Sequence, residues 1–501
     1  MSRPLAGILV HPWDLKDEGP SSVAEILHDA GITAVFVAVN ASAEEHPPQP
    51  VDGRLTHNPK RKRYVSEEGR FYYEIDPSYY VNSVAPPKRT SDKDLMGFDA
   101  LNESQVFLEK GISVYAWLAT FHNGQFVKDA QELAVVDVTN RADRNWMCPA
   151  NPNSLIQVLE LVNEIQSRYG FLQGILLDKF WWKYPHTYMP TLESGMVCFC
   201  EHCLGAMESS GIDPRELRRA LSEIASSVRR LDAGTLEKVA SVDLTPLLDI
   251  CGLPAREGAG YADVMNALFE NPSLRRRLPE LSEADPLGIF RWISKHPVLL
   301  DWFDLRSKFL QRDLEAIRTL VKQNDPTFEV GLGIWSPRSS WSVCQRYTDL
   351  LEHSDWLMPM VYHRIWGWYS TCVAEELFEI THPRTPRIFA SYKSILRSWY
   401  KLAGYSGSHL RSNIVNGLPL SQIEKELSRV RDLVGGRRPV YAGVQVWEPG
   451  SKIPHPQEAA ETIRIGLDSS EGVIIQAYGW APMPNLVAVG KVLNSLSQTQ
   501  P

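Results

Sequence analysis

The stretch GILLDKFWWKYP, residues 174–185, places a carboxylate at the end of an apolar run. Its first four residues are small or apolar, which is typical of a strand buried in a parallel sheet. Asp178 follows them directly, and then come Lys179, three aromatic residues, a second lysine and a Tyr-Pro pair. An acidic residue between a buried strand and several tryptophans indicates a functional site at that end of the strand.

The same arrangement, a short apolar run followed by a helical pattern, recurs along the chain. Eight runs rich in Val, Ile and Leu are predicted to be strands, namely 5–10, 32–39, 112–118, 173–177, 330–334, 355–361, 440–446 and 473–477. The clearest helical patterns are 21–31, 154–170 and 301–323. Eight such units predict an α/β fold, a (β/α)8 TIM barrel. A doubly wound open sheet is the alternative, since 387–392 is a ninth candidate strand.

Two long insertions interrupt the pattern, and each follows the carboxyl end of a strand. Residues 41–110 are polar and rich in Pro and Tyr, whereas 186–300 show helical patterns. We therefore expect the first half of the barrel in 1–185, a mostly helical insertion in 186–300 and the second half in 301–495. Because barrel active sites lie at the carboxyl ends of the strands, both insertions are expected to wall or cover the site.

The composition disfavours several classes of protein. Of 501 residues, 44% are hydrophobic, which is enough for a large core, and the formal net charge is -8. The basic run at 60–63 is short and lies in a polar loop, so we expect no nucleic-acid partner. No apolar run approaches the ~18 residues of a membrane span, and the N-terminus lacks a signal-peptide pattern. Together with an odd number of cysteines, seven, these features predict a cytoplasmic protein that binds no membrane.

Polar and aromatic side chains gather just past the ends of the predicted strands. Carboxylates, amides and imidazoles offer hydrogen bonds to hydroxyls, and indoles offer flat faces to sugar rings. The sequence has neither a Walker A loop nor a complete dinucleotide-binding motif. We therefore predict a carbohydrate site. The expected substrate-binding residues are Asp14, Asn40, His122, Lys179, Trp181, Trp335, Tyr362, His363, Gln445, Trp447, Gln476, Tyr478 and Trp480.

Asp178 and Glu448 are the two carboxylates that we expect to act in catalysis. Strands 4 and 7 face each other across a barrel mouth, and a glycosidase needs an ionised carboxylate opposite a carboxylic acid. Trp447 beside Glu448 would exclude water and raise the pKa of that carboxyl, as a general acid requires. Asp178 would then be the nucleophile or an electrostatic stabiliser. The alternatives are a loop cap for Asp178 and a solvated loop residue for Glu448, with Asp14 as the next candidate for proton transfer.

The segment CFCEHC brings three cysteines close together in the sequence. The C-x-C-x-x-C spacing can place Cys198, Cys200 and Cys203 on one zinc ion. Cys148 or His202 would be the fourth ligand. Such a zinc would be structural, so no cofactor is expected for catalysis. A reduced thiol cluster without metal is the alternative.

Taken together, these motifs resemble the glycoside-hydrolase-like (β/α)8 barrel proteins. Members of that family carry a strand-4 motif ending in R-Y-P, similar to LLDKFWWKYP at 176–185, and often a following C-F-C-x-x-C. The same pattern is matched by Cys148-Pro149, DWLMPMVY at 355–362, AGVQVW at 442–447 and GVIIQAYGW at 472–480. The resemblance covers most of 1–185 and 301–495 and specifies the fold better than the substrate.

The resemblance implies a glycoside hydrolase. With the carboxylates at the ends of strands 4 and 7 we expect it to be retaining, and the expected cytoplasmic location favours an oligosaccharide or small glycoside as substrate. Two departures bear on the mechanism: Trp182 and Lys183 replace the arginine of many relatives, and Gln445 stands where some carry glutamate. The alternatives are therefore a barrel that binds carbohydrate without cleaving it, and a lyase or isomerase acting on a sugar. Carbohydrate is the expected partner, and aromatic surface on the insertions could support a homo-oligomer.

Overall fold

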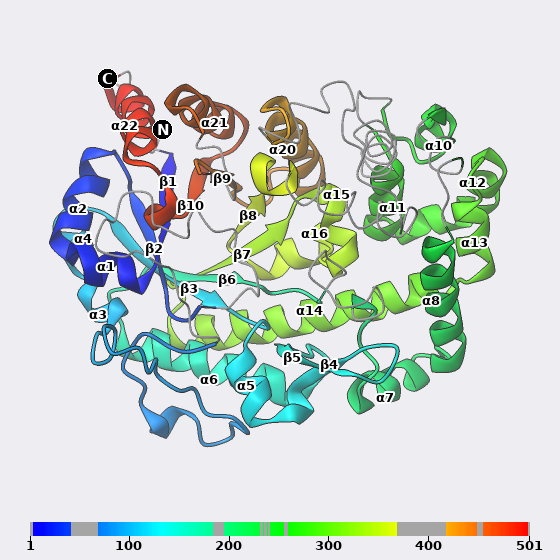
Figure 1. Cartoon of the computed structure of the whole chain (residues 1–501), viewed down its shortest axis with the longest axis horizontal. Coiled ribbons are helices and arrows are strands. Elements are labelled where there is room, and N and C mark those ends of the chain that lie inside the picture. Colours follow the sequence, from blue (N-terminus) through cyan, green and yellow to red (C-terminus); the bar gives the residue numbers. More distant parts are fainter. Residues whose placement is uncertain are drawn as a thin grey trace, which may run out of the picture.

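Eight parallel strands close into a barrel in the computed structural model (Figure 1). The structure describes residues 4–41, 69–183, 195–230, 234, 238, 241–254, 259–367, 417–447 and 454–498. The strands, in their order around the barrel, are β1 (Leu5–Val10), β2 (Ala34–Ala38), β3 (Ser113–Ala119), β6 (Gly174–Asp178), β7 (Glu329–Trp335), β8 (Trp356–Met360), β9 (Tyr441–Gln445) and β10 (Gly472–Gln476).

The closed sheet confirms the predicted α/β fold, a (β/α)8 TIM barrel. All eight predicted strands are present, and their ends lie within two residues of the predicted ones. Because β10 pairs with β1 in parallel register, the open doubly wound sheet is excluded. The ninth candidate strand, 387–392, lies outside the described residues.

Large rings fill the amino-terminal end of the barrel, and glycine makes room for them. Phe36 stacks on Tyr115 at 4.8 Å between ring centroids, and Trp356 meets both rings edge-on. The Tyr115 hydroxyl and the Trp356 indole donate to the same Glu329 oxygen, at 3.1 and 2.9 Å. A Cβ atom at Gly331 would overlap the Trp356 ring. Alternate residues of each strand therefore face the interior, which is packed and not a pore.

Helices surround the barrel (Figure 1). They are α1 (Pro12–Glu18), α2 (Pro20–Asp29), α6 (Pro152–Arg168), α14 (Val298–Asn324), α20 (Ser421–Val434), α21 (Pro456–Ser469) and α22 (Met483–Gln498). The side chain of Asn151 caps α6 by accepting the Asn153 N–H. In α14, Leu310, Leu314 and Val321 are buried at helical spacing. The helices α2, α6 and α14 confirm the three clearest helical predictions.

Shorter elements lie in the loops that leave the strands. After β2 come η2 (Pro77–Tyr79), α3 (Ala100–Glu103) and α4 (Val106–Glu109). After β3 come α5 (Gly124–Asp129), η3 (Gln131–Leu133) and the antiparallel pair β4 (Ala134–Val136) and β5 (Ala142–Met147). After β7 come α15 (Pro337–Ser340), η6 (Trp341–Val343), α16 (Tyr347–Leu350) and η7 (Leu351–His353), and η8 (Tyr478–Trp480) follows β10.

The described part of the insertion after β2 is anchored on helix α6. Tyr73 and Tyr80 both donate their hydroxyls to the same buried oxygen of Glu164, the first at 2.9 Å. Arg168, one turn further along α6, donates to the other oxygen at 2.7 Å. Burial is the main reason that the pKa of Tyr73 is raised well above its usual value. Near the start of this described part, the Tyr72 ring lies edge-on to Trp13 at 5.7 Å, so this end reaches the carboxyl-terminal side of the barrel.

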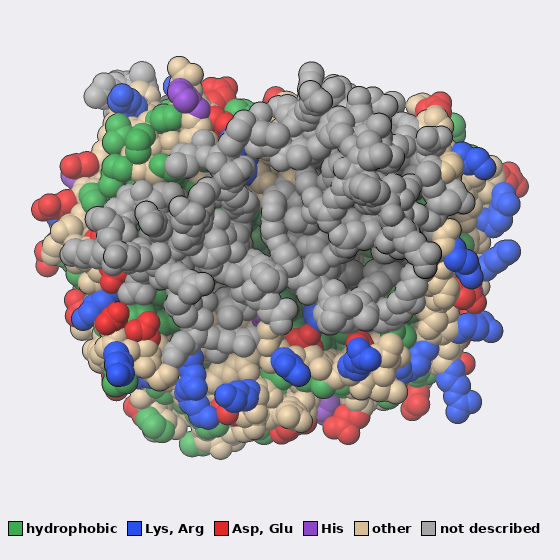
Figure 2. Space-filling model, in the orientation of Figure 1, with side chains coloured by type: hydrophobic (Ala, Val, Ile, Leu, Met, Phe, Trp, Pro, Cys, Tyr) green, Lys and Arg blue, Asp and Glu red, His purple; other side chains and the backbone are tan. Residues whose placement is uncertain are grey.

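The insertion after β6 contains mostly helices and forms one end of the molecule (Figure 1). They are α7 (Glu201–Ser209), α8 (Pro214–Arg229), α10 (Thr245–Ile250), α11 (Tyr261–Glu270), η5 (Pro272–Arg277), α12 (Leu278–Ala284) and α13 (Ile289–Lys295). On α8, Leu217 and Leu221 are buried whereas Arg215 and Arg219 are exposed. Basic side chains accordingly appear along this edge of the molecule (Figure 2).

This insertion has its own small apolar core. Leu247, Val264, Leu268 and Phe290 are among the buried side chains of a cluster separate from the main barrel core. The division into three segments with boundaries at 185 and 300 stays a prediction. Across the described ranges, no helix combines the length and the apolar character needed to cross a membrane.

Candidate functional site

Asp178 is the last residue of β6, and it lies at the carboxyl end of the barrel with only 8% of its surface exposed. The Trp117 indole N–H donates to Oδ2 at 3.0 Å, and the backbone N–H of Lys179 donates to Oδ1 at 2.7 Å. A Cβ atom at Gly333 on β7 would lie 3.5 Å from Oδ1. Lys179 has a φ of 53°, an uncommon value for a residue other than glycine. The carboxylate is therefore held in one orientation by two donors from the protein.

Tryptophans form a wall beside Asp178 on the side of β6, β7 and β8. The Trp181 and Trp335 rings lie 5.9 Å apart and nearly perpendicular, and Trp335 meets Trp366 at 4.9 Å. The Lys179 ammonium lies over the Trp181 ring, 5.5 Å from its centroid. Cations over indole faces are attracted by the ring quadrupole. This wall thus combines flat apolar faces with one positive charge.

Tyr362 continues the inward-facing positions of β8 and lies near Asp178. The side chain is buried, and burial raises the pKa of its hydroxyl well above the usual value, with the negative charge of Asp178 as a second cause. Tyr362 is therefore a neutral phenol at physiological pH. A neutral hydroxyl can donate to an anion or to a ligand oxygen.

A second aromatic group lies across the mouth, at the ends of β1, β9 and β10. Trp447 and Trp480 lie 4.5 Å apart, and His11 lies 5.5 Å from Trp480. His11 also stacks on Trp13 at 4.6 Å and meets Trp117 edge-on at 5.1 Å. Trp117 therefore touches both this group and the carboxylate of Asp178.

Several buried polar atoms at the strand ends have no hydrogen-bond partner among the described residues. They are Asp14 Oδ1, Trp181 Nε1, Gln445 Nε2, Trp447 Nε1 and Gln476 Oε1. A buried polar atom without a partner costs about 1–3 kcal/mol. Donors and acceptors concentrated in this way at one end of a barrel are suited to the hydroxyls of a ligand, or to water in its absence.

Asp14, Asn40 and Gln445 also bind the backbone around the mouth. Asp14 Oδ2 accepts the His11 N–H at 2.9 Å. The Asn40 amide exchanges two hydrogen bonds with the backbone of Ala119, at 2.9 and 3.0 Å, and so ties β2 to β3. Gln445 Oε1 accepts the Ile365 N–H at 3.1 Å. The Nε2 group of Gln445 is therefore the part of the amide that can donate to a ligand.

Three further predicted residues make contacts within the protein. The His122 ring stacks on Trp146 at 4.5 Å. His363 Nε2 lies 3.1 Å from Glu458 on α21, and the Tyr478 hydroxyl donates to Glu18 on α1 at 2.8 Å. Because Glu18 lies on α1 and Glu458 on α21, Tyr478 and His363 connect the strand ends to these two helices.

The carboxylate of Glu458 lies between the side chains of Arg364 and His363. Arg364 donates from Nε and Nη2 to its two oxygens at 2.7 and 2.6 Å, beside His363. Burial alone would raise the pKa of Glu458, but the donors from His363 and Arg364 outweigh it and lower the pKa to about 2. Burial lowers the pKa of His363. This network fixes the backbone that follows β8.

Sequence reasoning placed Asp178 at the strand end but missed Trp117. Trp117 lies inside the predicted strand 112–118, and the two-residue alternation from Tyr115 would have turned it into the barrel. Trp366, Arg364 and Glu458 were missed as well, because no local pattern marks them. Glu448, the predicted general acid, lies outside the described residues.

Four cysteines meet beside this site, as expected for the predicted zinc ligands. The sulfur atoms of Cys148, Cys198, Cys200 and Cys203 are buried and all lie within 4.8 Å of one another. Cys148 Sγ is 3.5 Å from Cys203 Sγ and 3.6 Å from Cys200 Sγ. Tetrahedral zinc with ~2.3 Å bonds to sulfur would separate its ligands by ~3.8 Å. A disulfide would require ~2.0 Å. The cluster therefore fits a structural metal.

The cysteine cluster joins the helical insertion to the β4–β5 pair. The Val136 N–H donates to Cys198 Sγ at 3.2 Å, and the Phe199 N–H donates to the Val136 carbonyl at 2.8 Å. From β5, the Trp146 indole donates to the carbonyl oxygen of Trp181 at 3.3 Å. A metal at the cluster would thus hold in place the segment that carries Trp181.

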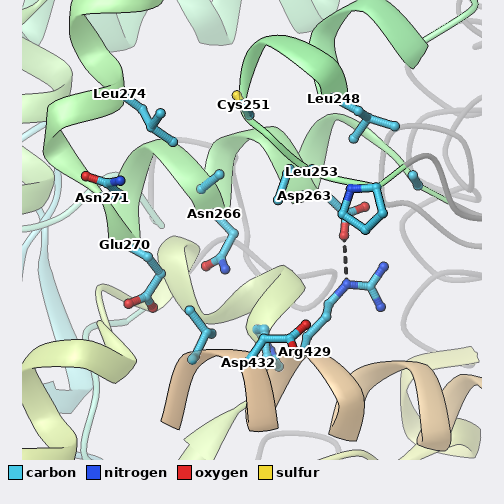
Figure 3. A pocket seen from close by; sticks show the side chains of 15 residues that line it. Leu248, Cys251, Leu253, Asp263, Asn266, Glu270, Asn271, Leu274, Arg429 and Asp432 are labelled. Atoms are coloured by element: carbon cyan, nitrogen blue, oxygen red, sulfur yellow. Dashed lines mark hydrogen bonds and ion pairs between the residues drawn. The ribbon is translucent and has the colours of Figure 1, made fainter. Parts of the chain in front are cut away.

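A cavity of about 250 Å³ lies elsewhere, between α11 and α20 (Figure 3). Arg429 on α20 donates to Asp263 on α11 at 2.9 Å across it. Glu270 accepts the N–H groups of Tyr347 and Thr348 at 2.9 and 3.2 Å, and burial raises its pKa to about 7. Because these polar groups already bind across the junction between insertion and barrel, we interpret the cavity as a gap at that junction.

Comparison with known proteins supports the fold alone. No protein-family model and no curated protein sequence matches this chain. The β-galactosidase of the Antarctic haloarchaeon Halorubrum lacusprofundi superposes with a TM-score of 0.50 at 10% identity, covering 98% of this chain and 58% of that one. The β-galactosidase of the psychrophilic Marinomonas ef1 gives 0.51 at 12% identity, covering 98% and 59%. This chain thus spans about three-fifths of the length of two glycosidases whose barrel fold it shares.

Proposed function

We propose that this protein is a retaining glycoside hydrolase that acts on an oligosaccharide or small glycoside. The observation that carries the proposal is the oriented carboxylate of Asp178, which lies between two groups of tryptophans at the carboxyl end of the barrel. The shared fold with two β-galactosidases supports the class of chemistry.

Asp178 would be the nucleophile and Glu448 the general acid and base. An Asp178 oxygen would bond to the anomeric carbon while the bond to the leaving oxygen breaks and that oxygen takes the proton of Glu448. Water would then give its proton to Glu448 and its oxygen to the anomeric carbon, which releases Asp178. Two N–H donors on Asp178 favour its charged form, as a nucleophile requires.

The indoles would hold the sugar rings, and the open polar atoms would bind their hydroxyls. Trp181, Trp335, Trp447 and Trp480 are the proposed platforms. Asp14, Gln445 and Gln476 are the best supported hydroxyl ligands, because each has a buried polar atom without a partner among the described residues. The proposed set also includes Asn40, His122, Lys179, Tyr362, His363 and Tyr478.

We further propose that Cys148, Cys198, Cys200 and Cys203 hold one zinc ion with a structural role. Their sulfur separations support four ligands around one metal. A site with four thiolates has no open position for water, so it would supply no catalytic chemistry. We also propose that the protein acts in the cytoplasm on imported glycosides and that it forms a homo-oligomer.

The test is hydrolysis of a panel of aryl glycosides by the wild-type protein and by Asp178→Asn. We expect the wild type to release sugar of the same anomeric configuration as the substrate, as seen by proton NMR, and the variant to lose at least ~10³-fold in kcat/KM. Binding of sugars without cleavage would favour the non-hydrolytic barrel. An unsaturated product without oxygen from labelled water would favour a lyase.

A further inference from the structure

We propose that Trp117 is a positioning residue that holds Asp178 in its carboxylate form, oriented into the barrel mouth. This inference rests on the proposed function, and it concerns a residue outside the site predicted from the sequence. The contact that carries it is the 3.0 Å hydrogen bond from the Trp117 indole to Asp178 Oδ2.

The strand register explains how these two residues meet. In the parallel pair of β3 and β6, Ala119 lies opposite Asp178 and Trp117 lies opposite Leu176. Trp117 is thus one inward-facing layer below the carboxylate, and its long side chain reaches up to it. Trp117 is half-buried, whereas Ala119, nearer the rim, is buried. The Trp117 side chain therefore keeps part of its surface accessible, although it lies one layer below Asp178.

The chemistry of the two donors determines which protonation state of Asp178 they favour. An indole N–H and a backbone N–H can only donate, so neither can accept a proton from a carboxylic acid. Hydrogen bonds of this kind favour a charged carboxylate over its neutral form. Trp117 and the Lys179 N–H therefore suit a carboxylate that attacks, and they disfavour a carboxylic acid that donates.

Three other polar side chains lie near Asp178 or Trp117. The Lys179 ammonium lies over Trp181, the Tyr362 hydroxyl is kept neutral by burial, and His11 meets the edge of the Trp117 ring. Trp117 supplies a side-chain hydrogen bond to Asp178 Oδ2, and the backbone N–H of Lys179 supplies one to Oδ1. Trp117→Phe removes the N–H donor and leaves an aromatic ring, smaller than the indole, at the same position.

The experiment compares Trp117→Phe with wild type in two measurements. In protein labelled with 15N-tryptophan, the Trp117 indole resonance should shift with pH in the wild type and lose that shift in Asp178→Asn. In kinetics, Trp117→Phe should lower kcat about 10- to 100-fold, the loss of one hydrogen bond to a charged group, with KM nearly unchanged. The acid limb of the kcat/KM profile should move to higher pH.

Trp356→Phe is the matched control, because its indole also donates to a carboxylate, that of Glu329, at 2.9 Å but at the other end of the barrel. It should leave the acid limb in place. An indole resonance that ignores Asp178, or an unchanged acid limb in a folded Trp117→Phe, overturns the proposal. If the wild type cleaves no glycoside, the proposed function fails. The pH dependence of the Trp117 indole resonance still shows whether the indole is hydrogen-bonded to Asp178. The Asp178→Asn measurement keeps the test valid if Trp117→Phe does not fold.

Discussion

The sulfur atoms of Cys148 and Cys203 lie 3.5 Å apart, although 55 residues separate them in the chain. Cys148 precedes α6 and Cys203 lies in α7. The contact therefore joins two segments that precede and follow β6, the strand that carries Asp178, in the sequence. A metal bound here would stabilise the folded chain by joining these segments, because its ligands are not assembled in the unfolded state.

We expect purified protein to contain about one zinc ion per chain. Chelation at moderate heat, or Cys200→Ser, should lower the unfolding temperature, because the buried thiols would lose their shared partner. Metal analysis and thermal unfolding measure both effects. Cys251→Ser is the control, since Cys251 lies outside the cluster and is only half-buried. If the purified protein contains no metal and chelators do not change its unfolding temperature, the four cysteines form a reduced thiol cluster without metal.

Gln445→Glu should weaken substrate binding more than it slows turnover. The new carboxylate can still accept the Ile365 N–H that Gln445 binds at 3.1 Å, but it can no longer donate from Nε2. The loss of one donor to a hydroxyl should raise KM about tenfold. Steady-state kinetics with the best aryl glycoside measures this. Gln105→Glu adds the same charge at an exposed position and should change neither constant.

Stability should fall between pH 4.5 and about pH 7 because of Glu270. Burial raises the pKa of this carboxyl from 4.5 to about 7. Since the folded pKa is the higher one, its stabilising contribution is present below pH 4.5 and is lost as the pH rises to about 7. The shift corresponds to about 3 kcal/mol in the free energy of unfolding.

Urea unfolding at several pH values measures how the free energy of unfolding changes with pH. Glu270→Gln should reduce this change, whether the variant itself is more or less stable than the wild type. Asp313 needs the same control, because burial raises its pKa to about 7 as well. If the Glu270→Gln, Asp313→Asn double variant keeps the full wild-type slope, neither carboxyl is responsible.

Gly331→Ala should destabilise the barrel by about 1–3 kcal/mol, because an added methyl would overlap the Trp356 ring inside a packed core. The free energy of unfolding from urea titration measures the loss. Gly205→Ala in α7 is the matched control, since nothing lies within 4 Å of its added Cβ. There, alanine should be neutral or stabilising by up to ~1 kcal/mol. Equal effects in the two variants would mean that the overlap at Gly331 is relieved without cost.

The strands were predictable because burial on both faces requires apolar runs, and such runs are visible in a single window of sequence. The position of Asp178 followed from the same pattern, since the residue after a barrel strand faces the mouth. Trp117 was not predicted, because a tryptophan within an apolar run is most simply explained as core. Its function depends on a carboxylate 61 residues away.

The sequence by itself determined the eight strands, the helices that separate them and the residue types at the strand ends, because periodicity and burial are local properties of the chain. Only the tertiary structure decided which of those residues meet. Barrel closure places Trp117 under Asp178, turns His363 to Glu458 on α21 and gathers Cys148 with the three later cysteines. These contacts depend on strand register and on the stacking of inward-facing layers, which no local pattern specifies.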